Sequence, residues 1–268
     1  MKFNAICGLP RSGSTLLCNV LNQNPRFYAS STSCLARSIR SLSNVWTASP
    51  EIKSDLIVDK TATDERMARS TRALIESWYA DRNAEVVFDK DRHWNHSIPL
   101  LQHLYPDAVA IVCVRDLRSI FASVEKRHSE NPLLEGIDSP NETTKLARAD
   151  RMFSPNGMIG QNITGIEDII RRKPNNVLIF QYETFVRQPQ LIIDRIYSLL
   201  GEEAYEHDFD NVKSTATDQD ALYLNKFPHD SAGKIEAKDD NWAEHVPQDI
   251  AGLIMQKFSG FNRVLGYQ

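Results

Sequence analysis

The stretch Gly8-Leu9-Pro10-Arg11-Ser12-Gly13-Ser14-Thr15 lies between the apolar run FNAIC (3–7) and the helical pattern STLLCNVLNQ (14–23). A strand that turns through glycines into a helix can bind phosphate, because the turn directs backbone N–H groups inward and the helix start adds partial positive charge. The sequence therefore predicts an anion-binding loop made of Pro10, Arg11, Ser12, Gly13, Ser14 and Thr15. The alternative is an ordinary strand-to-helix turn with Ser14 as the N-cap.

The cation of this loop differs from that of ATP-binding loops. The pattern GxxxxGK[ST] places a lysine before its Ser/Thr, where it contacts the β and γ phosphates while the hydroxyl binds magnesium. Here Ser14 takes the place of the lysine, and the only positive charge is Arg11. This difference weakens a magnesium-nucleotide assignment and leaves anion binding intact.

Further short apolar runs occur at EVVFDK (85–90), AVAIVCV (108–114) and NVLIFQY (176–182). Nearly continuous apolar runs of this length are typical of parallel strands that are covered on both faces. Helical patterns separate or follow them at 64–82, 96–106, 117–127, 190–201 and 247–258. The alternation predicts one α/β domain over 1–268, a three-layer doubly wound parallel sheet whose first βα turn is of the phosphate-loop type.

Two regions interrupt this pattern. Residues 128–165 are rich in proline and glycine, which predicts an irregular, lid-like or substrate-shaping insertion, with a solvated insertion as the alternative. Residues 202–268 predict an irregular tail followed by a C-terminal helix.

Composition excludes several classes of protein. The formal net charge of −4 argues against a nucleic-acid coat or a polybasic membrane surface, and no apolar run reaches the roughly 18 residues that a membrane span requires. The four cysteines have no metal-ligand spacing, so we expect reduced, buried thiols and no metal site. Because no membrane span is predicted and the first strand starts almost at Met1, we expect a cytoplasmic protein. The oligomeric state cannot be read from the sequence.

A second anion site is predicted where the strand at 110–114 ends in Arg115-Asp116-Leu117-Arg118. Ligands of open α/β sheets bind beyond the carboxyl ends of the strands, and Ser123 follows about two helical turns later. An arginine fork with a hydroxyl suits a terminal phosphate. Alternatively, Arg115 pairs with Asp116 at the surface and Ser123 only packs. Together with the loop at residue 11, the pair suits a nucleotide phosphorylated at two positions of its ribose.

GLPRSGST, FDKD, VRDLRSIFAS and QYETFV together resemble the sulfotransferases that use 3′-phosphoadenosine 5′-phosphosulfate (PAPS). The ending, WAEHVPQDI through RVLGY, is similar to the protein-tyrosine and carbohydrate branch. The resemblance implies transfer of a sulfuryl group to a hydroxyl or amine of a small-molecule, carbohydrate or peptide acceptor, with adenosine 3′,5′-bisphosphate (PAP) as product. It also implies site roles: Arg11 through Thr15 on the 5′ phosphosulfate, Arg115 and Ser123 on the 3′ phosphate, Tyr182 and Lys234 near the nucleotide, and Lys90 in catalysis. Without it, Lys90 between Asp89 and Asp91 suggests a surface ion pair.

The proton acceptor departs from both branches of that family. A glutamate of the tyrosine-directed branch corresponds to Ser31-Thr32-Ser33, and the histidine of the small-molecule branch corresponds to Arg92, with His93 next to it. Histidine suits proton transfer near neutral pH, so His93 is the first candidate and His96 the second. A capping or surface histidine is the alternative.

Two other functions fit parts of the sequence. A small-molecule kinase that uses Mg-ATP would take Asp89 and Asp116, each after an apolar strand, as magnesium ligands. A non-catalytic relative would keep the nucleotide site without the base.

Overall fold

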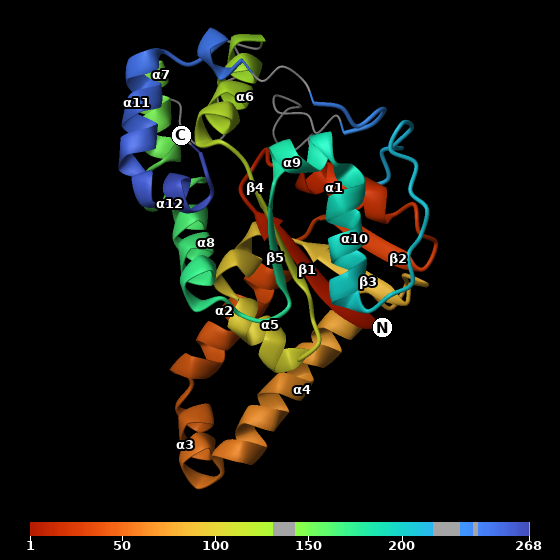
Figure 1. Ribbon diagram of the computed structural model, residues 1–268. Helices are drawn as coiled ribbons and strands as arrows, with labels where there is room; N and C mark the ends of the chain where they lie inside the picture. The colour runs from red at the N-terminus through yellow and green to blue at the C-terminus, as the bar shows by residue number, and fades with distance from the viewer. Residues whose placement is uncertain (131–142, 217–230, 238–240, 268) are drawn as a thin grey trace.

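The computed structural model describes residues 1–130, 143–216, 231–237 and 241–267. Its centre is a parallel five-stranded sheet (Figure 1) of β1 (Lys2–Gly8), β2 (Phe27–Thr32), β3 (Val86–Lys90), β4 (Ala110–Val114) and β5 (Val177–Gln181). The strand order is β2-β3-β1-β4-β5. Because all strands are parallel, the segments after β1, β3, β4 and β5 leave the sheet at one edge.

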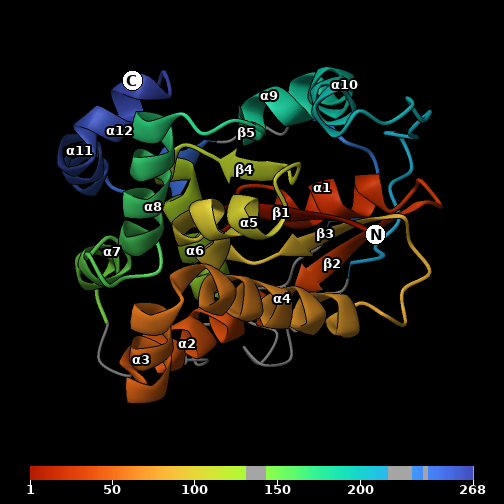
Figure 2. The same ribbon diagram turned by 90° about the horizontal axis from the view of Figure 1, so that it is seen from below.

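Helices cover both faces of the sheet, as the sequence predicts (Figure 2). One face carries α1 (Ser14–Leu21), α9 (Tyr182–Arg187) and α10 (Pro189–Leu200), and the other carries α2 (Leu35–Ala48), α4 (Lys60–Trp78), α5 (Ile98–Leu104) and α8 (Gly160–Arg172). The remaining helical elements are α3 (Pro50–Val58), α6 (Leu117–Glu130), α7 (Lys145–Met152), α11 (Gln248–Lys257), α12 (Ser259–Val264) and the 3-10 turns η1 (Arg92–His96) and η3 (Trp242–Glu244). The three-layer α/β architecture is confirmed.

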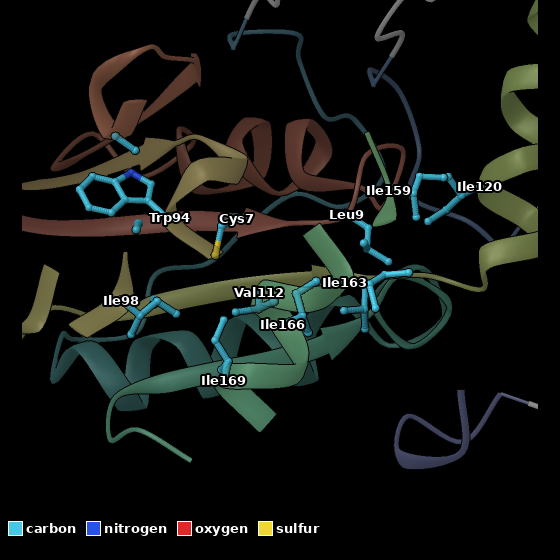
Figure 3. Close-up of a cluster of buried hydrophobic side chains, with 14 of the residues drawn as sticks. Cys7, Leu9, Trp94, Ile98, Val112, Ile120, Ile159, Ile163, Ile166 and Ile169 are labelled. Carbon is cyan, nitrogen blue, oxygen red and sulfur yellow. The ribbon is translucent and has the colours of Figure 1, made fainter. Parts of the chain in front are cut away.

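Alternate residues of one strand supply both halves of the core. Cys7 of β1 belongs to the cluster under α8, whereas Ile6 belongs to the cluster under α1 and α10. Figure 3 shows Ile166 of α8 directed toward Val112 of β4 in the first of these clusters. Burial on both faces explains why the central strands are nearly continuous apolar runs.

The segment between the phosphate loop and residue 64 differs from the sequence prediction. It contains the edge strand β2 and the helices α2 and α3, none of which is predicted. The sequence of β2, FYASST, has only two of its six residues, Phe27 and Ala29, buried and apolar. The helix α3 has no buried residue and lies beyond the sheet at the bottom of Figure 1.

The predicted insertion at 128–165 is more regular than expected where the structure describes it. α6 runs to Glu130, α7 spans Lys145–Met152 and α8 begins at Gly160, while 131–142 lies outside the described residues. A buried ion pair of 2.6 Å between Arg148 of α7 and Glu125 of α6 joins the two helices. Because Arg148 of α7 contacts α6 through an ion pair and not through apolar packing, this contact adds no apolar residue to the pattern that would predict a helix. Closure as a lid stays a prediction.

The tail matches its prediction in part. α11 lies within the predicted helix 247–258, and α12 follows it unpredicted. The four cysteines are free, and Cys7, Cys18 and Cys113 are buried. In the described ranges we find no helix long and apolar enough to cross a membrane.

Candidate active site

The loop after β1 depends on two glycines. Gly8 and Gly13 have φ of +121° and +83°, which L-residues with side chains rarely adopt. A Cβ on Gly8 would lie 2.0 Å from the carbonyl oxygen of Cys113, and a Cβ on Gly13 would lie 2.7 Å from the ring of Tyr182. The loop therefore packs against β4 and the Tyr182 ring with no room for a side chain at either position.

Internal hydrogen bonds fix the loop further. The Ser12 hydroxyl donates to the carbonyl of Leu9 at 2.6 Å, and the Asn95 amide donates to the carbonyl of Gly8 at 2.9 Å. The Ser12 hydroxyl therefore holds the loop and is not a free donor in this conformation. Gly13, not Ser14, is the N-cap of α1, so the Ser14 cap of the ordinary-turn alternative is wrong.

Lys90 ends β3 next to this loop. Its ammonium donates to the Thr15 hydroxyl at 2.8 Å, and its backbone N–H donates to the Ser30 hydroxyl at 2.9 Å. Lys90 is only 5% exposed, and both flanking aspartates are buried as well. The surface ion pair suggested by the sequence is therefore wrong, and a cation lies at the start of α1.

Arg115 follows β4 and reaches the same loop. Its Nη1 donates to the carbonyl of Arg11 at 3.0 Å, and its guanidinium lies 4.5 Å from the centre of the Tyr182 ring. The Arg11 Nε donates to the Ser123 hydroxyl at 3.2 Å. Asp116, the partner in the sequence alternative, instead forms a 2.6 Å ion pair with Arg118. The two segments for which anion sites were predicted are thus in direct contact.

Glu183 and Tyr267 support this edge of the sheet and were missed in the sequence. Glu183 accepts hydrogen bonds from the Asp116 N–H at 3.1 Å and from the Tyr267 hydroxyl at 2.9 Å. Burial, together with the charge of Glu183, raises the pKa of Tyr267, which keeps its hydroxyl a donor. Tyr182, which the sequence predicts near the nucleotide, begins α9 directly after β5. Glu183 could have been predicted as a site residue because it is the next residue along the chain.

A buried carboxylate supports β3 on the other side. Asp89 accepts hydrogen bonds from the Tyr79 hydroxyl and, at 2.6 Å, from Nε1 of Trp94. Burial raises the pKa of Asp89. Because Asp89 and Asp116 both have protein partners, the two proposed magnesium ligands of the kinase alternative lose their support.

The two candidate histidines lie in η1. His93 directs Nδ1 to the Asp91 carboxylate at 2.7 Å, and its side chain is 38% exposed. His96 lines a cavity of about 430 Å³ with Asn95, Thr164, Gly165, Glu167, Asp168, Arg171 and Arg172. Burial, aided by the charges of Arg40 and His93, lowers the pKa of His96 and favours its neutral form.

The segment that replaces the family glutamate has a structural task. The Ser33 hydroxyl accepts a hydrogen bond from the Leu35 N–H at 3.1 Å, at the start of α2. Its backbone N–H donates to the Lys90 carbonyl at 2.9 Å, so Ser33 lies beside the candidate catalytic lysine. No carboxylate side chain occurs at Ser31, Thr32 or Ser33.

Lys234 is placed differently from the other predicted residues. Its ammonium forms a 2.8 Å ion pair with Asp210, and its side chain is 61% exposed. This contact gives the lysine a surface partner, so its contribution to nucleotide binding stays a prediction.

The carboxyl edge of this α/β sheet, where ligands of open sheets bind, thus gathers the glycine-containing loop, two arginines and a lysine. The sequence profile described as "Sulfotransferase family" matches residues 5–207. The chain belongs to the sulfotransferase family.

Individual relatives agree with this assignment. A putative protein-tyrosine sulfotransferase of Caenorhabditis briggsae is 23% identical over 195 residues, which cover 72% of this chain and 63% of that protein. Mouse sulfotransferase SULT7A1, solved in complex with PAP, is 14% identical with a TM-score of 0.56 over 98% of this chain and 84% of its own. The sulfotransferase domain of the Synechococcus PCC 7002 olefin synthase is 19% identical with a TM-score of 0.51 over 96% and 94% of the two chains. These solved structures share the fold.

Proposed function

We propose that the protein transfers a sulfuryl group from PAPS to an acceptor hydroxyl or amine and releases PAP. The observation that carries the proposal is the contact between the loop and the second predicted anion site: Arg115 donates a 3.0 Å hydrogen bond to the backbone carbonyl of Arg11, and the Arg11 guanidinium donates a 3.2 Å bond to Ser123. It supports one ligand with anionic groups at both places. Membership of the sulfotransferase family, and a structural neighbour solved with PAP, support PAPS as that ligand.

In this proposal the loop holds the 5′ phosphosulfate. The backbone N–H groups from Ser12 to Thr15 face the phosphate at the start of α1, whose partial positive charge favours an anion. Arg115 and Ser123 bind the 3′ phosphate, where the guanidinium supplies a planar fork and the hydroxyl one further donor. Tyr182 then sets the position of the Arg115 guanidinium through their stacking contact.

Transfer proceeds in line between the acceptor oxygen and the bridging oxygen of the phosphosulfate. The bond from the acceptor oxygen to sulfur forms while the bond from sulfur to the bridging oxygen breaks, and the leaving PAP gains negative charge. Arg11 and Lys90 are the cations that stabilise this charge, which is why we propose a metal-independent reaction. His93 accepts the proton of the acceptor hydroxyl. The Lys90 ammonium, which donates to the Thr15 hydroxyl in this structure, donates instead to the departing oxygen.

Calorimetry separates this function from its rivals. PAP should bind without metal and more tightly than Mg-ATP, whereas the kinase alternative requires the opposite order. Transfer of labelled sulfate from PAPS to a mixed acceptor library then distinguishes an enzyme from a non-catalytic relative. Tight PAP binding with no labelled product from hydroxyl, amine, carbohydrate or peptide acceptors would favour the non-catalytic relative.

We also propose a class of acceptor and a cellular compartment. A small-molecule, carbohydrate or peptide acceptor would approach from the side of η1, where His93 is exposed. The free state of all four cysteines supports the cytoplasm as its compartment.

A further inference from the structure

Asp91 is the residue after Lys90, and it holds the ring of His93. One carboxylate oxygen, Oδ1, lies 2.7 Å from Nδ1 of the imidazole and also accepts the His93 backbone N–H at 2.9 Å. A carboxylate oxygen only accepts, so in the neutral ring Nδ1 carries the proton and Nε2 has the lone pair. The geometry therefore selects one tautomer of the neutral His93 ring.

The burial of Asp91 goes beyond what a turn requires. The residue is 3% exposed, and within the described part of the chain its second oxygen, Oδ2, is buried without a hydrogen-bond partner. Burial is the main cause that raises the pKa of the Cys7 thiol, and the negative charge of Asp91 is the second. The Asp91 carboxylate therefore lies close enough to the buried end of β1 to affect a group there. Burying a carboxylate with one oxygen unpaired is costly, and the cost calls for a compensating role.

Asp59 shows what an aspartate does when capping is its only task. Its Oδ1 accepts the Ala62 N–H at 3.0 Å at the start of α4, and the residue is exposed to solvent. Asp91 makes the same kind of cap at η1, but it is buried and adds the imidazole contact. Burial and the ring contact are thus the features that the cap alone leaves unexplained.

We propose that Asp91 is a positioning residue that orients His93 as proton acceptor, an inference that rests on the proposed function. The acceptor hydroxyl gives its proton to Nε2 as its oxygen bonds to sulfur. The resulting imidazolium is stabilised by the Asp91 carboxylate, which stays ionised, and the proton leaves to solvent after the product departs. Lys90 and His93, on either side of Asp91, would then serve the leaving oxygen and the attacking oxygen respectively.

Nitrogen NMR of the full-length protein labelled at histidine tests the orientation without any turnover. We expect the neutral ring of His93 to carry its proton on Nδ1 in the wild type and to shift toward the Nε2–H tautomer in Asp91→Ala, which removes the acceptor that faces Nδ1. Asp59→Ala removes the carboxylate of an exposed cap and should leave the His93 signal unmoved. An unchanged His93 tautomer in Asp91→Ala overturns the inference.

Kinetics with PAPS and an acceptor found in the library tests the consequence. Asp91→Asn should lower kcat at least about 100-fold with KM nearly unchanged, because the imidazolium loses the carboxylate charge that stabilises it; the same change at a catalytic Asp–His pair costs up to about 10,000-fold. In a His93→Gln background it should have no further effect, whereas a merely structural role would add its own loss. Full activity of Asp91→Asn beside an impaired His93→Gln overturns this inference alone. Full activity of His93→Gln overturns the base role in the proposed function as well.

Discussion

The Arg11 guanidinium donates a 3.2 Å hydrogen bond to the Ser123 hydroxyl, although 112 positions separate the two residues. Arg11 belongs to the loop after β1 and Ser123 to α6 after β4, and these two strands are neighbours in the sheet. The bond joins the proposed 5′ and 3′ phosphate sites. When PAPS binds, Ser123 would exchange this partner for an oxygen of the 3′ phosphate, and Arg11 would turn to the bridging oxygen of the phosphosulfate.

Arg11→Ala should abolish most of the transfer. Loss of one donor that stabilises developing charge costs about 3 to 4 kcal/mol of barrier, or about 100- to 1,000-fold in kcat. Arg11→Lys keeps the charge without the planar fork, so its kcat should lie between that of Arg11→Ala and that of the wild type. The measurement is the initial rate of labelled sulfate transfer, with the exposed Arg187→Ala as control. A kcat of Arg11→Ala within a few-fold of the wild type contradicts the assignment of the loop.

Ser123→Ala should weaken PAP about tenfold and leave AMP unaffected, because AMP lacks the 3′ phosphate. The expected loss is about 1.5 kcal/mol, the value of a hydrogen bond to a charged group. Titration calorimetry with both nucleotides measures it, and Ser129→Ala, near the other end of α6, is the matched control. Equal losses for PAP and AMP would place Ser123 on the shared part of the nucleotide instead.

Gly13→Ala and Gly8→Ala should fail in different ways. A Cβ at Gly8 meets the backbone of Cys113, which cannot give way, so we expect a loss of about 3 kcal/mol or more in the free energy of unfolding. A Cβ at Gly13 meets the Tyr182 ring, which can turn away from Arg115, so PAP binding should suffer while the backbone strain costs only about 1 to 2 kcal/mol. Urea unfolding and calorimetry on both variants separate these effects. The reverse order of destabilisation would show that the loop relaxes.

Asp89→Asn should change how stability depends on pH. Burial raises the pKa of Asp89 in the folded state, so the folded protein holds this proton more readily than the unfolded chain. The resulting stabilisation is present below the unfolded pKa of about 4 and is lost as the pH rises through the folded pKa. The wild type should therefore lose stability relative to Asp89→Asn between acid and neutral pH. Urea unfolding across that range checks it, with the exposed Asp107→Asn as control; a constant difference refutes the effect.

The central strands could be predicted because burial on both faces leaves a continuous apolar run, as in β4 and its neighbour β1. The edge strand β2 could not, because its buried Ser30 looks like a loop residue in sequence. The Ser30 hydroxyl is satisfied by the N–H of Lys90, 60 positions away. A polar residue that is buried through such a distant contact has no local signature.

The candidate site was also only partly predictable from the sequence. A parallel sheet brings the carboxyl ends of its strands to one edge, so Arg11 and Arg115 could be placed together from strand positions alone, whereas Lys90 was placed there only by the family resemblance. The role of Asp91 could not, because an acid beside a lysine has the appearance of a surface pair. These residues are buried because β3 lies inside the sheet, between β2 and β1.

Arg11 has φ of +56°, a left-handed conformation that costs a residue with a side chain about 1 to 2 kcal/mol and that glycine adopts freely. Arg11→Gly should accordingly withstand more urea than Arg11→Ala, although both lose sulfate transfer. Selection for heat resistance alone would thus discard the side chain to which the proposed function assigns charge stabilisation. Stabilising substitutions that are meant to preserve sulfate transfer should therefore be sought at positions other than Arg11.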